Sequence, residues 1–74
     1  MTRLPRTTGR KVVAALKREG FKVVRITGSH HHLHKPGSRL VTVPIHAGEI
    51  LSPIILKSIL NQAGLTVEQL INLL

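Results

Sequence analysis

The chain has 74 residues, 42% of them apolar, with no cysteine and a formal net charge of +8 when histidine is neutral. The length fits a single small domain, and the lack of cysteine excludes disulfides and thiolate metal sites. No apolar run reaches the roughly 18 residues of a membrane span, and no signal-peptide pattern is visible. We therefore predict one soluble cytoplasmic domain over residues 1–74, with an aliphatic core because Phe21 is the only aromatic residue.

Positive charge is concentrated in the first half of the chain. All but one of the eleven Lys and Arg residues lie in residues 1–39, where Glu19 is the only acid. Residues 40–74 carry Lys57 against Glu49 and Glu68. Such an imbalance favours a polyanionic partner, most commonly the phosphate backbone of a nucleic acid, over a merely solubilising surface.

The first predicted elements are a flexible basic arm over residues 1–6 and a helix over residues 10–19. Thr7 or Thr8 is suited to accept a hydrogen bond from a free backbone N–H at the helix start. Apolar residues recur at helical spacing along one side of this segment. Gly20 supplies the left-handed residue that commonly ends a helix.

A three-stranded antiparallel sheet is predicted to follow. β-Branched residues and short connecting turns favour strands here. Pro36 and Gly37 have the backbone preferences of the two central positions of a turn, and Pro44 stops the last strand because it has no N–H. The predicted strands are residues 21–27, 30–34 and 39–43, joined by turns at 28–29 and 35–38.

Two helices complete the chain after a short loop. Ser52-Pro53 combines a cap residue with a first-turn proline, and Gly64 ends this helix. Thr66 and Gln69 form a capping box that opens the last helix. The order α-β-β-β-α-α predicts an α+β fold in which the helices cover one face of the sheet.

Four of the five histidines lie in one short segment after the first predicted strand. Imidazole has an unperturbed pKa near neutrality, which suits proton transfer, metal binding or pH sensing. Because strand side chains alternate, His30, His32 and His34 share one face of the sheet, which we expect to be exposed. Leu33 should point at the helices on the other face, with His31 partly beneath them.

Three classes of function are compatible with these residues. The first is an RNA-cleaving enzyme, because a 2′-hydroxyl can attack its own phosphate when an imidazole removes its proton and cations stabilise the phosphorane. The second is a metal protein, since His-x-His places two imidazoles on one side of a strand, although no acid lies near the cluster. The third is a non-catalytic RNA- or DNA-binding module of double-stranded-RNA-binding-domain-like fold.

Several short motifs occur in a characteristic order along the chain. They are residues 9–12, 20–21, 28–31 and 41–44, then His46 and residues 56–66. As an ordered set they resemble the HicA family of toxin ribonucleases, over nearly the whole chain from Gly9 onward. One departure is the segment 52–56, Ser-Pro-Ile-Ile-Leu, where family members often carry Gly-Thr-Leu or a similar run before Lys-Ser-Ile.

The resemblance implies a fold like the double-stranded-RNA-binding domain and a toxin of a type II toxin–antitoxin pair that cleaves mRNA. It also implies neutralisation by a HicB-type antitoxin, which would cover either the histidine face or the helices. The family's catalytic histidine directly follows Gly-Ser, which places it at His30, with Gly28 and Ser29 as supporting residues of the motif. We predict that cleavage needs no metal or other cofactor. The residues expected to contact RNA phosphates are Lys22, Arg25, His32, His34, Lys35, Arg39 and Lys57.

Overall fold

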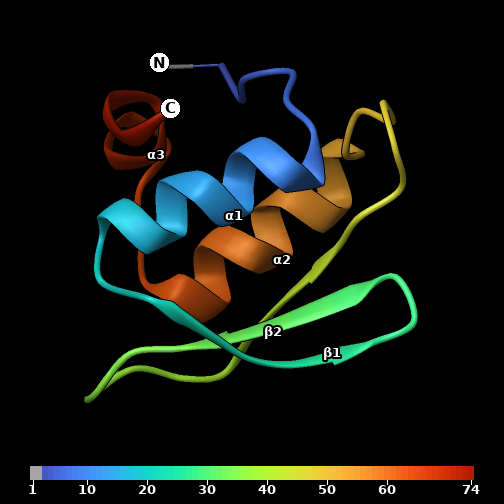
Figure 1. Ribbon diagram of the computed structural model, residues 1–74. Helices are drawn as coiled ribbons and strands as arrows, with labels where there is room; N and C mark the ends of the chain where they lie inside the picture. Colours follow the sequence, from blue (N-terminus) through green and yellow to red (C-terminus); the bar gives the residue numbers. More distant parts are fainter. Residues whose placement is uncertain (1–2) are drawn as a thin grey trace.

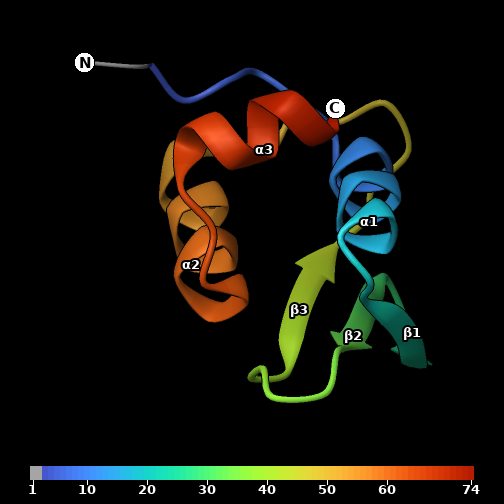
Figure 2. The ribbon, with the colours of Figure 1, turned by 90° about the vertical axis from the view of Figure 1, so that its left-hand side faces the viewer.

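The computed structural model describes residues 3–74 and has the predicted α+β architecture (Figure 1). Three helices lie on one side of a three-stranded antiparallel sheet of order β1-β2-β3, which confirms the predicted fold class (Figure 2). Residues 1–2 of the predicted arm lie outside the described residues, and Leu4 packs against the core. The elements are α1 (Gly9–Arg18), β1 (Lys22–Thr27), β2 (His30–His34), β3 (Val41–Pro44), α2 (Pro53–Ala63) and α3 (Val67–Leu73).

Helix α1 begins and ends within one residue of its predicted limits. The Thr8 hydroxyl accepts a hydrogen bond from the Lys11 backbone N–H (3.3 Å), as expected of an N-cap residue. At the other end Gly20 has φ = 108°, and the N–H of Phe21 donates to the Leu16 carbonyl (3.0 Å). This bond satisfies a carbonyl left free at the helix C-terminus and turns the chain into β1.

The two turns of the sheet have the backbone conformations that their glycines allow. Gly28 has φ = 58° and Ser29 has no positive φ, which is the type II′ arrangement whose twist matches that of a β-hairpin. In the second turn the Ser38 N–H donates to the Lys35 carbonyl (3.0 Å), and Gly37 has φ = 80°. Both turns lie where the sequence predicts them.

The third strand differs slightly from its prediction, because it runs over Val41–Pro44 rather than 39–43. The Ile45 N–H donates to the Ser29 carbonyl (2.7 Å), so the adjacent pair, His30 with Pro44, is of the non-hydrogen-bonded kind. Proline loses no ladder bond at such a position, which explains how the strand includes Pro44.

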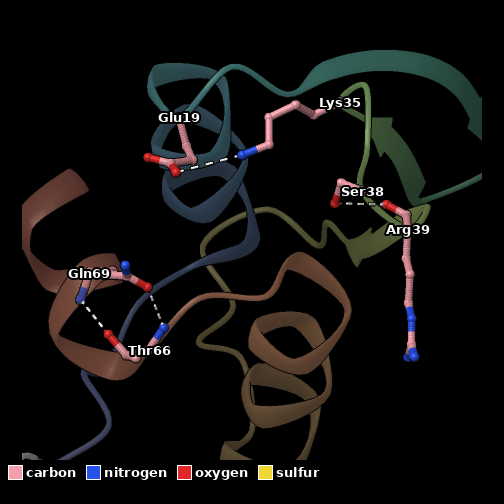
Figure 3. A network of polar contacts seen from close by, with 6 residues as sticks. All are labelled: Glu19, Lys35, Ser38, Arg39, Thr66 and Gln69. Carbon is pink, nitrogen blue, oxygen red and sulfur yellow. Dashed lines mark hydrogen bonds and ion pairs between the residues drawn. The ribbon is translucent and has the colours of Figure 1, made fainter.

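Helices α2 and α3 begin at the predicted caps. The Ser52 hydroxyl accepts from the Ile55 N–H (3.3 Å). The side chains of Thr66 and Gln69 each accept a hydrogen bond from the other residue's backbone N–H, at 3.1 and 2.8 Å (Figure 3). Gly64, with φ = 70°, ends α2 as predicted. No helix within residues 3–74 combines the length and the apolar character needed to cross a membrane.

The core between the helices and the sheet is aliphatic, apart from Phe21, and its best-buried members come from every layer of the fold. β1 contributes least, because Val24 and Ile26 are each 58% exposed. At the opposite edge of the sheet, the Thr42 N–H of β3 donates to the Gln62 side chain of α2 (3.1 Å). The fully buried large side chains are Phe21, Leu16, Leu33, Leu56, Ile59, Leu70, Val12, Val41 and Val43.

The N-terminus of α1 touches the end of β3 through Gly9. A Cβ atom built on Gly9 would lie 2.2 Å from the Pro44 carbonyl oxygen, closer than real Cβ atoms approach backbone. The loop after β3 is held in the same place, because the Leu51 N–H donates to the Thr7 carbonyl (2.9 Å). Glycine is therefore needed here for close approach of backbone, and not for its torsion angles.

Gly9→Ala tests this contact with an effect opposite to helix propensity. Alanine in a helix normally stabilises relative to glycine by about 0.5–1 kcal/mol. Because the Pro44 carbonyl must move, we expect a loss of about 1–3 kcal/mol instead, measured by denaturant unfolding. Ser58→Ala, at an exposed position of α2, is the control and should change stability by less than about 0.5 kcal/mol. A stabilised Gly9→Ala protein would show that the two segments do not touch in this way.

Candidate functional site

The outer face of the sheet, on which no helix of residues 3–74 packs (Figure 2), presents three histidines in a row along the central strand. Leu33 of β2 is completely buried on the helix side. The alternation of side chains then places His30, His32 and His34 on the outer face, as the sequence predicts. At about 3.3 Å per residue the row is about 13 Å long.

His30 lies at one end of this row, directly after the hairpin turn. It pairs with Thr27 of β1 and with Pro44 of β3. Its side chain is exposed, and within residues 3–74 neither ring nitrogen has a hydrogen-bond partner. His46 is also exposed and follows Pro44 by two residues. The imidazole of His30 is therefore free to exchange a proton with a bound molecule.

His32 connects the two outer strands of the sheet. Its Nε2 lies 2.8 Å from Oγ1 of Thr27 on β1, and its Nδ1 lies 3.0 Å from Oγ1 of Thr42 on β3. A neutral imidazole donates through one nitrogen and accepts through the other, and a hydroxyl can take either role. The sequence predicts an exposed His32, but the side chain is partly buried with both nitrogens engaged. A phosphate contact by His32 would have to replace one threonine.

A β-bulge in β1 determines which cations join the histidine face. Val23 pairs with Leu33 and Arg25 pairs with His32, so Val24 is an extra residue in β1. Lys22 then pairs with His34. Because paired residues share a face, both cations lie beside the histidine row, whereas an unbroken strand would send Lys22 and Arg25 to opposite faces. Two of the predicted phosphate-binding residues thus lie on the face of His30, Arg25 beside His32 and Lys22 beside His34 at the far end of the row.

The other predicted cations lie elsewhere. Lys35 Nζ lies 3.6 Å from a Glu19 carboxylate oxygen (Figure 3). It also lies 4.9 Å from the centroid of the Phe21 ring. Arg39 points away from this ion pair, and Lys57 is exposed on α2, on the helix side of the sheet. A phosphate contact by Lys35 would compete with Glu19, and Arg39 and Lys57 are not next to His30.

His31 takes the opposite face, as predicted. It lines a cleft of about 300 Å³ between the sheet and α1, and its Nδ1 is buried without a hydrogen-bond partner. Within the described part of the chain, no group of three or more His, Cys, Asp or Glu side chains is arranged to hold a metal ion. Structural and catalytic zinc sites need at least three protein ligands, so His-x-His here lacks the remaining ones.

Sequence reasoning misses the two threonines that hold His32. The signal was present in the hairpin, since a two-residue turn at 28–29 pairs Thr27 with His30 and brings Thr27 diagonally next to His32. Thr42 could be placed only once the register of β3 was known. Threonine is common in strands, so its presence there does not by itself indicate a hydrogen bond to a histidine.

Comparison with known families adds to this geometry. The family model described as the HicA toxin of bacterial toxin–antitoxin systems matches residues 9–65. The chain belongs to this family. The match covers α1, the whole sheet and α2, and therefore includes the histidine row. No curated protein matches the chain. This HicA-family protein is a toxin component, and its partner is of the toxin–antitoxin kind.

A pair of histidine variants tests the role of His32 in this HicA-family fold. His32→Ala removes both threonine contacts and should lower the free energy of unfolding by about 1–3 kcal/mol. His34→Ala is the control on the same strand and face, and its exposed side chain predicts a change within about 0.5 kcal/mol.

A double-mutant cycle with Thr42→Val isolates one of the two contacts. The effects of His32→Ala and Thr42→Val should be non-additive by at least about 0.5 kcal/mol, because each removes the same hydrogen bond. Strictly additive effects in denaturant unfolding would contradict the bridge between β2 and β3.

Proposed function

We propose that this toxin is an endoribonuclease that cleaves single-stranded mRNA without a metal or other cofactor, with His30 as its acid–base residue. The observation that carries the proposal is an exposed imidazole that has no hydrogen-bond partner among residues 3–74 and lies on the same open face as two cations. Membership of the HicA toxin family supports the toxin role. The place of His30 directly after Gly28-Ser29 is the position that the family motif implies for catalysis.

The reaction that suits a single imidazole is attack by RNA on itself. His30 accepts the proton of a ribose 2′-hydroxyl while that oxygen bonds to the adjacent phosphorus. The bond between phosphorus and the 5′-oxygen then breaks, and the leaving oxygen receives a proton from the imidazolium or from water. RNA provides its own nucleophile, so the protein needs to supply only proton transfer, orientation and positive charge.

Lys22 and Arg25 provide the positive charge on this face. Both flank the histidine row from β1, and both are exposed. A polynucleotide lying along β1 and β2 would place successive phosphates near Arg25, Lys22 and His34 while one phosphate reaches His30. Such contacts hold the backbone without reading its sequence.

A HicB-type antitoxin with an acidic surface is the partner that fits the charge of the toxin, which is +8. Covering the His30 face would block RNA without any long-range change in the toxin. The affinity of such a complex should fall as salt is raised, because screening weakens the attraction between exposed charges. An affinity independent of salt in a titration calorimetry series would contradict an acidic contact surface.

His30→Ala should lower the rate of RNA cleavage by about 10²–10⁴-fold or more, the usual contribution of a positioned acid–base group, and should abolish growth inhibition. Because His30 is exposed and has no hydrogen bond to any described residue, the fold and the thermal stability should be unchanged. The measurement is cleavage of a labelled single-stranded RNA by purified protein, with circular dichroism to verify folding.

His34→Ala is the matched control, since it removes an exposed imidazole from the other end of the same row. Because His34 is expected to contact a phosphate and not the reacting atoms, this variant should raise KM while leaving kcat near the wild-type value, whereas His30→Ala lowers kcat. Wild-type activity that survives EDTA supports metal-independent chemistry, and activity lost with EDTA and restored by added metal contradicts it. A wild-type protein that binds RNA in a salt-sensitive manner but never cleaves it would favour the alternative, a non-catalytic nucleic-acid-binding module.

A further inference from the structure

A second cationic site lies on the helix side of the sheet, behind His30. It is the cleft of about 300 Å³ that α1 forms with β2 and the start of the loop after β3. Apolar side chains make part of its lining, and three groups able to bear positive charge make the rest. The lining residues are Arg10, Val13, Ala14, Lys17, His31 and Ile45.

The two cations are aligned by the periodicity of the helix. Arg10 and Lys17 are seven residues apart, which is close to two turns, so they project from the same side of α1 about 10 Å apart. Both are exposed, and within residues 3–74 neither has a hydrogen bond or ion pair. Their charges are therefore uncompensated and available to an anion.

His31 contributes a hydrogen-bond donor with a defined position. Its Nδ1 is buried and unpartnered, so placing a proton there would bury an N–H without an acceptor. The favoured neutral form of the ring therefore carries its proton on Nε2. Nε2 is not among the buried unpartnered atoms and has no hydrogen bond within the described residues, which leaves it open to a ligand.

We propose that this cleft binds a backbone phosphate of the RNA, close to the phosphate on which His30 acts. The inference rests on the proposed ribonuclease function and extends its substrate-binding surface around the end of the sheet. Arg10 and Lys17 supply charge, His31 Nε2–H supplies a neutral donor, and Val13 and Ala14 offer an apolar floor for a ribose.

The path between the two sites is short and open. His30 and His31 are consecutive residues on opposite faces of β2, and they follow the turn at Gly28-Ser29. A Cβ atom built on Gly28 would meet nothing within 4 Å. A single strand can therefore pass over the turn, with one phosphate at His30 on the outer face and a neighbouring one in the cleft.

An acidic segment of a protein partner is the competing occupant. RNA is favoured because the cleft adjoins the one exposed imidazole that lies beside the turn, and because a phosphate accepts hydrogen bonds from two cations and an N–H at once. A neighbouring cavity along α1, lined in part by Arg6, Lys11 and Arg18, contains no histidine. Arg18 there already donates to the Leu73 carbonyl.

The test is RNA binding by the double variant Arg10→Gln/Lys17→Gln, made in the cleavage-deficient His30→Ala protein so that the RNA stays intact. Fluorescence anisotropy with a labelled single-stranded RNA should give a Kd raised about tenfold or more. The slope of log affinity against log salt should fall by about 0.7, the change expected when one phosphate of single-stranded RNA is no longer neutralised.

The control is Arg6→Gln/Lys11→Gln in the same background, which removes equal charge from the neighbouring cavity that Leu74 also lines. All four substituted residues are exposed, so both double variants should fold. The control should change Kd by less than about threefold, since only long-range attraction is lost. If the two double variants raised Kd equally, the cleft would not be a specific phosphate site.

A second measurement follows His31 directly. In the His30→Ala protein, adding the RNA should shift the Nε2 signal of His31 in nitrogen-detected NMR, and the Arg10→Gln/Lys17→Gln change should abolish that shift. Unchanged His31 signals at saturating RNA would overturn the proposal. So would unchanged RNA affinity of the double variant together with loss of antitoxin binding, which would assign the cleft to a protein partner.

These outcomes are separable from the ribonuclease proposal. Suppose that the wild-type protein never cleaves RNA but Arg10→Gln/Lys17→Gln weakens RNA binding more than the control does. The cleft is then confirmed as a phosphate site, and the catalytic role of His30 is wrong. If the wild-type protein cleaves RNA but the Arg10→Gln/Lys17→Gln change, placed in a protein that retains His30, leaves KM and kcat unaltered, the cleft fails and the catalytic role stands.

Discussion

The burial of one leucine sets the orientation of the whole candidate site. Leu33 is completely buried against the helices at the centre of the middle strand. Because strand residues alternate, this burial sends His30, His32 and His34 to the open face and His31 beneath α1. A register slip by one residue would expose Leu33, at a cost of about 2 kcal/mol, and would turn His30 toward the core. The hydrophobic core therefore holds the polar face in position.

Two features that do not depend on the core determine which charges lie on the open face and how its strands are held together. The bulge at Val24 places Lys22 on the same side as Arg25, which doubles the positive charge beside the histidine row. The bridge from Thr27 through His32 to Thr42 ties the three strands together at the middle of that row. In a domain of this size the sheet has few strands to support it, so side-chain bonds across all three are valuable.

The histidines of the cluster therefore have different physical environments despite their adjacency. His30 is exposed and has no hydrogen-bond partner in the part of the chain that the structure describes. His32 is hydrogen-bonded through both ring nitrogens, and His31 has one nitrogen buried beneath α1. Only an imidazole with a free nitrogen can exchange a proton with substrate, which supports His30 for chemistry. His32 is better suited to stabilising the sheet. The Nε2–H group of His31 is suited to the phosphate contact that we propose on the helix side.

Much of the architecture follows from local chemistry and was predictable from the sequence. Thr8, Ser52 and Thr66 cap their helices, and Gly20 and Gly64 end two of them, because these contacts involve residues close in sequence. The type II′ turn likewise needs only Gly28. The face taken by each histidine was also predictable, since alternation within β2 is regular and Leu33 is its only apolar residue.

Only the tertiary structure decided the features that depend on contacts between segments distant in the sequence. The bulge in β1 arises from its register against β2, and nothing in the run Lys22–Thr27 marks Val24 as the extra residue. The hydrogen bond from His32 to Thr42 requires the register of β3, and the cleft at His31 requires the packing of α1 over the sheet. By itself the sequence determined which residues bear charge and imidazole, because composition and local periodicity carry that information. Three-dimensional packing decided which of those groups meet, because long-range contacts are selected by the fold as a whole.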